Sequence, residues 1–185
     1  LMFSVIGFFH CVVTAFATAG TGGFSVKGAS IAGYHSPYVE YVVATFMLLF
    51  GVNFNLYFFM ILRKFKAVFQ DTELKVYLGM VTASVALICI NLLSTGKMAF
   101  ETAFRDSYFT VVSIVSTSGF VTADFEQWSV FSKVILISLM FVGGMAGSTA
   151  GGMKITRIVL YFKQMIRDIK QMVRPRQVMS VRINK

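Results

Sequence analysis

The sequence has few charged residues for its length: Asp, Glu, Lys and Arg make up 14% of its 185 residues, whereas 56% of the residues are hydrophobic. A soluble domain needs a charged, water-facing surface, and this composition does not supply one. The mean hydropathy of +0.73 leads to the same conclusion. The sequence therefore excludes an ordinary soluble domain and predicts a membrane protein.

Charge is entirely absent from four stretches, which are residues 1–26, 41–62, 76–96 and 134–153. Because roughly 20 apolar residues carry a helix across the hydrocarbon core, several of these stretches can span a bilayer. We interpret residues 41–62 and 76–93 as two ordinary crossings. Since the chain opens inside an apolar run on Leu1 instead of Met, we expect it to be a segment of a larger protein.

Cysteine is also scarce, and its placement excludes a metal site. Cys11 and Cys89 lie in different apolar stretches, with no second Cys or His at metal-ligand spacing. We interpret them as small core residues. His10 and His35 have no partner at a useful spacing, so neither is assigned a role, and no cofactor is expected in this chain.

The basic residues predict the orientation of the chain in the membrane. Residues 63–75 hold four basic and two acidic side chains, and residues 154–185 hold nine basic and one acidic. By the positive-inside rule both segments are cytoplasmic. The final basic segment continues directly from a span with its charges spaced as on a helix, which favours anionic lipid or a docking partner and disfavours nucleic acid.

Residues 100–128 do not fit a simple crossing, because charged residues at both ends fall on the outer side while residues 107–123 carry no charge. Such a segment enters the membrane and returns as a re-entrant hairpin. Its return arm, residues 117–122, is built of small and hydroxyl residues around Gly119, which can adopt strained backbone angles. Lipid-facing carbonyls would be costly, so we expect a polar ligand to meet them.

The chain contains an internal repeat with an offset of 96 residues. The shift superposes Phe8 on Phe104, Thr14 on Thr110, Thr21 on Thr117, Gly23 on Gly119, Phe24 on Phe120 and, in the following span, Gly51 on Gly147. The predicted order is hairpin, span, span, hairpin, span, or one and a half copies of a span, re-entrant helix, span unit.

A re-entrant helix of this kind is suited to a cation. Its C-terminal end carries roughly −0.5 of a charge toward the membrane centre, and Thr and Gly carbonyls can replace the hydration shell of an ion. Two copies cannot enclose a pore, because a ring of carbonyls needs about four donors per level. Either two chains associate or further repeats complete the ring.

Three segments carry a family resemblance: residues 16–25 (FATAGTGGFS), 116–120 (STSGF) and 141–154 (FVGGMAGSTAGGMK). They resemble the Trk/Ktr/HKT potassium transporter superfamily, most closely its TrkH type, and the similarity covers nearly the whole chain. The family has four pseudo-repeats around a central potassium path. The resemblance therefore implies half of a pseudo-four-fold, potassium-channel-like assembly.

The resemblance also implies a division of the chain. Residues 1–69 would form the second pore repeat without its first span, residues 70–162 the complete third repeat, and residues 163–185 a basic cytoplasmic tail. It further implies a multi-pass protein of the bacterial cytoplasmic (inner) membrane, surrounded by lipid and by the remaining pore repeats. The expected partners are a second copy in a homodimer and a cytoplasmic nucleotide-binding ring of the TrkA type.

The site residues follow from the same resemblance. Potassium, the only metal expected, would meet the filter carbonyls of Thr21, Gly22, Gly23, Thr117, Ser118 and Gly119. A glycine-rich intramembrane loop would gate the path below the filter, with the residues Gly143, Gly144, Gly147, Ser148, Thr149, Gly151 and Gly152. Lys154 closes this stretch, where it either snorkels to the interface or tunes cation exit at the inner mouth.

Two segments allow a simpler interpretation. Gly143, Gly147 and Gly151 are spaced by four, as in a straight helix with a small-residue packing face. Five glycines in ten residues would cost roughly 1 kcal/mol each against Ala in a helix, which favours a break. Asn53 and Asn55 sit mid-span beside Gly51, where they would form interhelical hydrogen bonds or line the cavity.

Enzyme functions lack their motifs. A P-loop needs Lys directly after Gly152, where Met153 stands, and a serine hydrolase built on Ser148 and His10 has no G-x-S-x-G elbow. A structural scaffold leaves the two hairpins unexplained. The nearest alternative, the pore module of a homo-oligomeric potassium channel, would repeat one filter, whereas TGGF and TSGF differ. We therefore predict no enzyme but potassium, or monovalent cation, uptake through a gated carbonyl filter.

Overall fold

The computed structural model describes residues 2, 5–95 and 99–173, and the regular structure in these residues is entirely helical. The α-helices are α1 (Phe8–Ala19), α2 (Pro37–Phe50), α3 (Phe54–Ile61), α4 (Phe65–Gln70), α5 (Thr72–Ser94), α6 (Phe100–Val115), α7 (Val130–Val142) and α8 (Ile155–Val173). Two short 3-10 helices, η1 (Ser30–Tyr34) and η2 (Phe125–Gln127), lie in the loops that follow α1 and α6.

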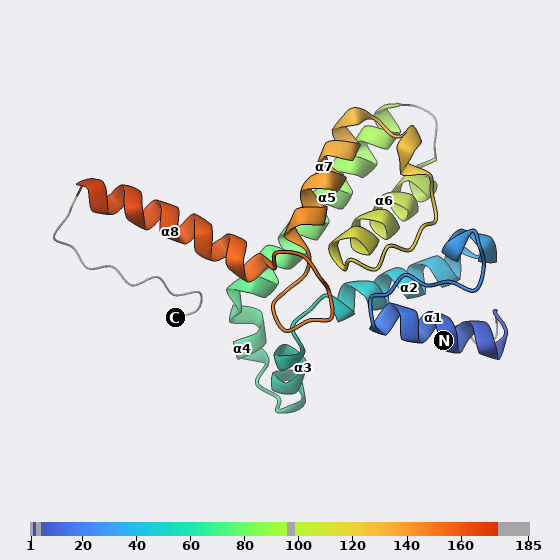
Figure 1. Ribbon diagram of the computed structural model, residues 1–185, viewed down its shortest axis with the longest axis horizontal. Helices are drawn as coiled ribbons and strands as arrows, with labels where there is room; N and C mark the ends of the chain where they lie inside the picture. The colour runs from blue at the N-terminus through green and yellow to red at the C-terminus, as the bar shows by residue number, and fades with distance from the viewer. Residues whose placement is uncertain (1, 3–4, 96–98, 174–185) are drawn as a thin grey trace.

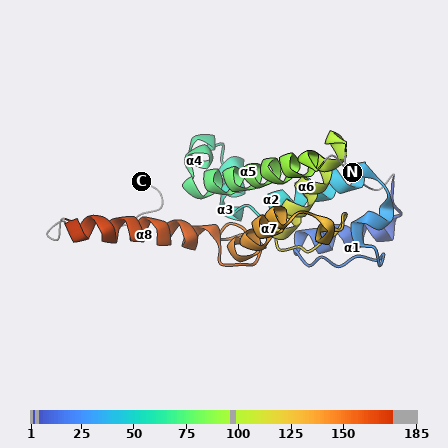
Figure 2. The ribbon, with the colours of Figure 1, turned by 90° about the horizontal axis from the view of Figure 1, so that it is seen from above.

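Most of the helices form two packed groups, α3 and α4 pair beside the start of α5, and α8 projects as an arm (Figure 1). Helices α5, α6 and α7 contact one another, and α1 packs beside α2. The two groups meet where α2 packs against α6. Helix α8 extends away from the rest of the molecule, as Figure 2 also shows from a second direction. It runs without interruption past residue 163, where the predicted cytoplasmic tail begins, and residues 174–185 of that tail lie outside the described residues.

Helix α5 agrees with the predicted crossing over residues 76–93. It has 23 residues and is the one described helix that is long and apolar enough to cross a membrane by itself. The helix begins at Asp71, whose carboxylate accepts a 2.9 Å hydrogen bond from the N–H of Leu74. Its side chains Tyr77 and Ile88 are fully buried against the neighbouring helices. Helix α5 is therefore the central support on which α6 and α7 pack.

The predicted crossing over residues 41–62 is not one unbroken helix. Helices α2 and α3 are separated by a short break and are bent by 91° relative to each other. Gly51 caps the end of α2, and the side chain of Asn53 caps the start of α3. Hydropathy alone favoured one helix, because the break at residues 51–53 carries no charge and lies within an apolar run.

The internal repeat is visible in the backbone. Helices α1 and α6 end at equivalent positions, Ala19 and Val115. The turns that follow also match: Gly22 N–H donates to the Ala17 carbonyl over 2.8 Å, as Ser118 N–H donates to that of Ser113 over 3.0 Å. The two hairpins therefore share one local geometry.

The repeat changes register in the spans. Helix α2 ends at the cap Gly51 and α7 ends at the cap Gly143. By the ends of these helices Gly51 corresponds to Gly143, whereas the 96-residue shift superposes it on Gly147. The connection between hairpin and span differs in length between the two copies, so one sequence offset cannot align both.

Candidate functional site

The chain leaves each re-entrant helix in a strained backbone conformation. Thr21 and Thr117 have φ angles of 50° and 56°, and two residues later Gly23 and Gly119 have φ angles of 67° and 79°. A β-branched residue at positive φ is an outlier that persists only where its surroundings impose it. Glycine adopts these angles without the penalty, which explains its place in both TxGF motifs.

In the part of the chain that the structure describes, the carbonyl oxygens of these turns accept no hydrogen bond. Among the described residues, none of the six carbonyls of residues 21–23 and 117–119 accepts a hydrogen bond. The flanking carbonyls do: that of Gly20 accepts from the Thr21 hydroxyl over 2.8 Å, and that of Phe120 accepts from the Ser113 hydroxyl over 2.7 Å. Two groups of three bare oxygens are therefore left for a ligand, and oxygen dipoles of this kind suit a cation.

The two turns lie against each other, although 96 residues separate them. A Cβ atom added to Gly23 would collide with the Ser118 carbonyl oxygen and would lie 3.4 Å from the carbonyl carbon of Gly119. The contact continues beyond the turns, where Val121 N–H donates to the Ser30 hydroxyl over 3.1 Å. Gly23 is thus required both for its backbone angle and for the close approach of the second hairpin.

Buried hydroxyls brace the second turn. The Ser116 and Ser118 hydroxyls lie 2.9 Å apart, and Ser113 bonds to the carbonyl of Phe120. The equivalent positions of the first hairpin are Ala17, Gly20 and Gly22, which have no hydroxyl. Ser113 and Ser116 were not among the predicted site residues, although hydroxyl residues on the buried face of an apolar helix are a signal that could have identified them.

The glycine-rich segment is not helical between Gly143 and Lys154, so the straight-helix interpretation is wrong. The two ends of this segment lie against each other. A Cβ on Gly152 would lie 2.8 Å from the Cα of Gly143, and a Cβ on Gly143 would collide with the Gly151 carbonyl. Ile155 N–H also donates to the Gly144 carbonyl over 3.1 Å. The paired glycines at each end therefore allow the neck of a closed loop, here called the glycine loop (residues 143–154).

The glycine loop occupies the break between α2 and α3. The last carbonyls of a helix have no partner within it, yet each one at the end of α2 finds a donor. The donors are Tyr77 Oη for Leu48 (2.9 Å), Tyr57 Oη for Leu49 (2.6 Å), Thr149 Oγ1 for Phe50 (3.3 Å) and Met145 N–H for Gly51 (3.0 Å). Two of the four donors belong to the glycine loop, so the break and the loop stabilise each other.

The glycine loop also contacts both hairpins. The Thr117 hydroxyl accepts a 2.6 Å hydrogen bond from Gly151 N–H. The Thr21 hydroxyl shares its one proton between the carbonyls of Gly20, at 2.8 Å, and Thr149, at 3.0 Å. Thr21 and Thr117 are equivalent residues of the two repeats. Their backbone carbonyls are bare while their side chains hold the loop, so the structure brings the predicted filter and gate residues into direct contact.

Asn53 and Lys154 have local roles that the sequence did not predict. The side-chain oxygen Oδ1 of Asn53 accepts a 2.9 Å hydrogen bond from Asn55 N–H, and Gly147 packs against this side chain. Asn53 therefore caps α3 beside the glycine loop, and Asn55 is exposed. The Lys154 ammonium donates to the Ala150 carbonyl, so this residue is tied to the glycine loop itself.

Charges assigned by sequence to the outer side are partly buried. Glu40 on α2 and Asp106 on α6 are each 8% exposed. Arg105 lies between them, with its Nε 2.9 Å from Glu40 Oε2 and 3.7 Å from Asp106 Oδ1. The guanidinium joins α6 to α2 and holds the two repeats together near the start of the re-entrant helix.

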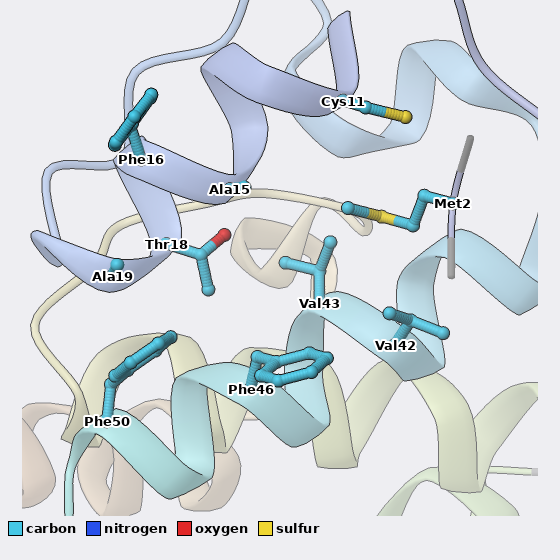
Figure 3. A pocket seen from close by; sticks show the side chains of 10 residues that line it. All are labelled: Met2, Cys11, Ala15, Phe16, Thr18, Ala19, Val42, Val43, Phe46 and Phe50. Atoms are coloured by element: carbon cyan, nitrogen blue, oxygen red, sulfur yellow. The ribbon is translucent and has the colours of Figure 1, made fainter. Parts of the chain in front are cut away.

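A separate groove of about 430 Å³ lies between α1 and α2 (Figure 3). Its walls are almost entirely apolar, with side chains such as Met2, Val43 and Phe46 pointing toward it. Its one hydroxyl, on Thr18, already donates to the Thr14 carbonyl over 2.6 Å. The groove offers no ligand for a dehydrated cation, so the ion-binding candidate is the pair of turns.

Comparison with known proteins gives consistent results. Residues 4–185 match the family model described as "TrkH: Cation transport protein". The chain is 36% identical over 190 residues to the Trk system potassium uptake protein TrkH of Escherichia coli K12, covering 99% of this chain and 38% of that protein. It is 31% identical over 176 residues to TrkG of the same strain, covering 95% of this chain and 36% of TrkG.

A solved structure supports the fold as well. The crystal structure of the potassium transporter TrkH from Vibrio parahaemolyticus matches with a TM-score of 0.84 and 31% sequence identity, covering 95% of this chain and 38% of that one. The chain thus spans little more than a third of the length of the relatives that it matches.

Proposed function

Since this chain belongs to the TrkH family of cation transport proteins, as its motifs predicted, and is an all-α membrane protein, we propose that it forms half of a potassium uptake pathway. The ion would pass along the bare carbonyls of residues 21–23 and 117–119. These six oxygens on two adjacent turns are the observation that carries the proposal.

The surrounding helices favour a cation at this position. Helices α1 and α6 both end at the turns, so the negative ends of their dipoles lie beside the bare carbonyls. A dehydrated ion needs several oxygens at once, and two turns supply only part of a ring of carbonyls. The remaining pore repeats of the longer protein would supply the missing oxygens around the same axis.

The pseudo-tetramer is a better interpretation than a homo-oligomeric channel. The second turn is braced by Ser113 and Ser116, whereas the first has Ala17 and Gly20 at these positions. A ring of identical subunits would repeat one arrangement at every position. Two unequal turns in one chain favour a ring of four different repeats.

The glycine loop would act as the gate. It bonds to the side chains of Thr21 and Thr117, directly beside the bare carbonyls. A loop held by a few hydrogen bonds in a helix break can be displaced at modest free-energy cost. Displacement would open the path between the filter and the inner side, where Lys154 ends the loop.

The assembly and location follow the family. The protein would work in the bacterial inner membrane as a homodimer in contact with lipid, with a cytoplasmic nucleotide-binding ring of the TrkA type as regulator. Helix α8 carries basic side chains toward that side, including Arg157, Lys163 and Arg167. No catalytic activity or further cofactor is proposed.

The filter is tested by Gly119→Ser in the full-length protein, expressed in cells that lack other potassium uptake systems. Gly119 has a φ angle of 79°, so a side chain there strains the backbone that orients the carbonyls. We expect lower potassium uptake and a weaker preference for K⁺ over Na⁺. The matched control is Gly28→Ser, because a Cβ at Gly28 meets no atom within 4 Å. Unchanged uptake and preference in Gly119→Ser would refute the proposed filter.

A further inference from the structure

Glu73 is a buried carboxylate that joins three segments of the chain. It lies in the first turn of α5 and is 6% exposed. Its Oε1 accepts a 2.7 Å hydrogen bond from the backbone N–H of Ala146 in the glycine loop. The same oxygen accepts a hydrogen bond from the hydroxyl of Thr156, in the first turn of α8.

These contacts matter because of the charge and the burial of the carboxylate. A buried carboxylate without hydrogen-bond donors is costly, and hydrogen bonds to an ionised acceptor are roughly twice as strong as neutral ones. The Ala146 N–H lies outside any helix, so the carboxylate replaces the helical bond that this donor lacks. Glu73 therefore fixes the backbone of the glycine loop in its first half, at Ala146.

The position of Thr156 extends this contact to α8. Helix α8 starts at the end of the glycine loop and projects away from the other helices (Figure 1). A displacement applied along α8 acts first at its anchored end, where Thr156 meets Glu73. The contacts of the glycine loop with Gly51 and Thr117 approach it from other sides and involve neither α5 nor α8.

A positive charge completes the cluster. The Lys154 ammonium interacts electrostatically with the Glu73 carboxylate while it donates to the Ala150 carbonyl. Lys154 precedes α8 and Thr156 lies in its first turn, so a charge attracted to the Glu73 carboxylate and a hydroxyl bonded to it both lie at this end of the helix. The arrangement resists movement of the loop and of the first turn of α8 as one unit.

We propose that Glu73 is a positioning residue that couples α8 to the glycine loop and holds the loop closed. The inference rests on the proposed function of this loop as a gate. In this mechanism, movement of α8 withdraws the Thr156 hydroxyl, weakens the hold of the carboxylate on Ala146 N–H and releases the loop from the path.

The test measures basal Rb⁺ uptake per molecule at the membrane in the full-length protein without its regulator. We expect Glu73→Ala to raise basal uptake about tenfold, which corresponds to about 1.4 kcal/mol in the gate equilibrium. Thr156→Val should raise it by less, and Thr156→Ser should restore the closed state. The double variant should exceed Glu73→Ala only slightly, because both changes break one shared contact.

Selectivity separates release of the gate from structural damage. If only the glycine loop moves, the preference for K⁺ over Na⁺ stays at the wild-type value, whereas collapse of the fold would lower both uptake and preference. The matched controls are Glu126→Gln, an exposed carboxylate of the outer loop, and Thr82→Val on α5, whose hydroxyl bonds to the Leu78 carbonyl of its own helix. Both controls should leave basal uptake unchanged.

The outcomes distinguish this inference from the proposed function. If deletion of residues 147–151 raises basal uptake but Glu73→Ala does not, the loop is a gate and Glu73 does not hold it, so the inference is wrong. If the deletion leaves basal uptake unchanged, the proposed gate itself is wrong. The inference would also be overturned if Glu73→Ala and Glu73→Gln both lost uptake and selectivity. That result would mean that Glu73 stabilises the fold and does not specifically hold the loop.

Discussion

The Thr117 hydroxyl accepts a hydrogen bond of 2.6 Å from the backbone N–H of Gly151. Thr117 belongs to the turn after the second re-entrant helix, and Gly151 belongs to the neck of the glycine loop. One residue therefore offers a bare carbonyl to a ligand and its side chain to the loop. In this chain the proposed filter and the proposed gate are adjacent parts of one structure.

Removal of this hydroxyl should release the glycine loop. Thr117→Val keeps the shape and the backbone carbonyl but leaves Gly151 N–H without its acceptor, at a cost of about 1–3 kcal/mol. We expect higher basal Rb⁺ uptake with unchanged ion preference, measured in the full-length protein. Thr117→Ser keeps the hydroxyl and should behave like the wild type. Equal uptake in the Val and Ser variants would show that this hydrogen bond does not hold the loop.

The two filter glycines should differ in their tolerance of alanine. Gly119→Ala meets no atom within 4 Å and carries only the cost of a left-handed backbone, about 1–2 kcal/mol. Gly23→Ala carries the same cost and also collides with the Ser118 carbonyl oxygen. Potassium uptake should therefore fall further in Gly23→Ala. The reverse order, at matched protein levels, would contradict the close packing of the two turns.

The neck of the glycine loop should not accept a side chain. Gly143→Ala combines a φ angle of 69° with a collision at the Gly151 carbonyl. We expect it to lower the apparent melting temperature of the purified protein in detergent. The control is Gly79→Ala on α5, where a Cβ meets nothing within 4 Å and alanine favours the helix by about 0.5–1 kcal/mol. If both variants melt at the same temperature, the neck does not have the described geometry.

The ion pair between the repeats should show strong coupling. Arg105→Gln leaves the Glu40 carboxylate, whose side chain is 10% exposed, without its cation, and should destabilise the protein by about 1–3 kcal/mol. The double variant Glu40→Gln/Arg105→Gln removes both charges and should recover part of this loss. A double-mutant cycle in thermal unfolding measures the coupling. Additive effects would show that the two side chains do not stabilise each other.

Short-range patterns determined much of this protein. The scarcity of charge predicted membrane helices, and α5 fits the predicted crossing because its apolar run matches the length of a span. The two TxGF motifs predicted matching turns, because positive φ angles two residues apart are a local property of Thr and Gly in this pattern. Five glycines between residues 143 and 152 predicted a break in the following helix, since the cost of glycine in a helix is also local.

Only the tertiary structure decided the rest, because it depends on contacts between distant residues. The break after Gly51 lies within an apolar run, so the sequence does not reveal it. It is stabilised because Met145 and Thr149, almost 100 residues away, donate hydrogen bonds to carbonyl oxygens at the end of α2. The bonds of Thr117 to Gly151 and of Glu73 to Ala146 likewise join segments with no sequence relationship. Hydropathy and spacing report how a residue fits its own helix, whereas hydrogen-bond partners across the fold are fixed only when the helices pack.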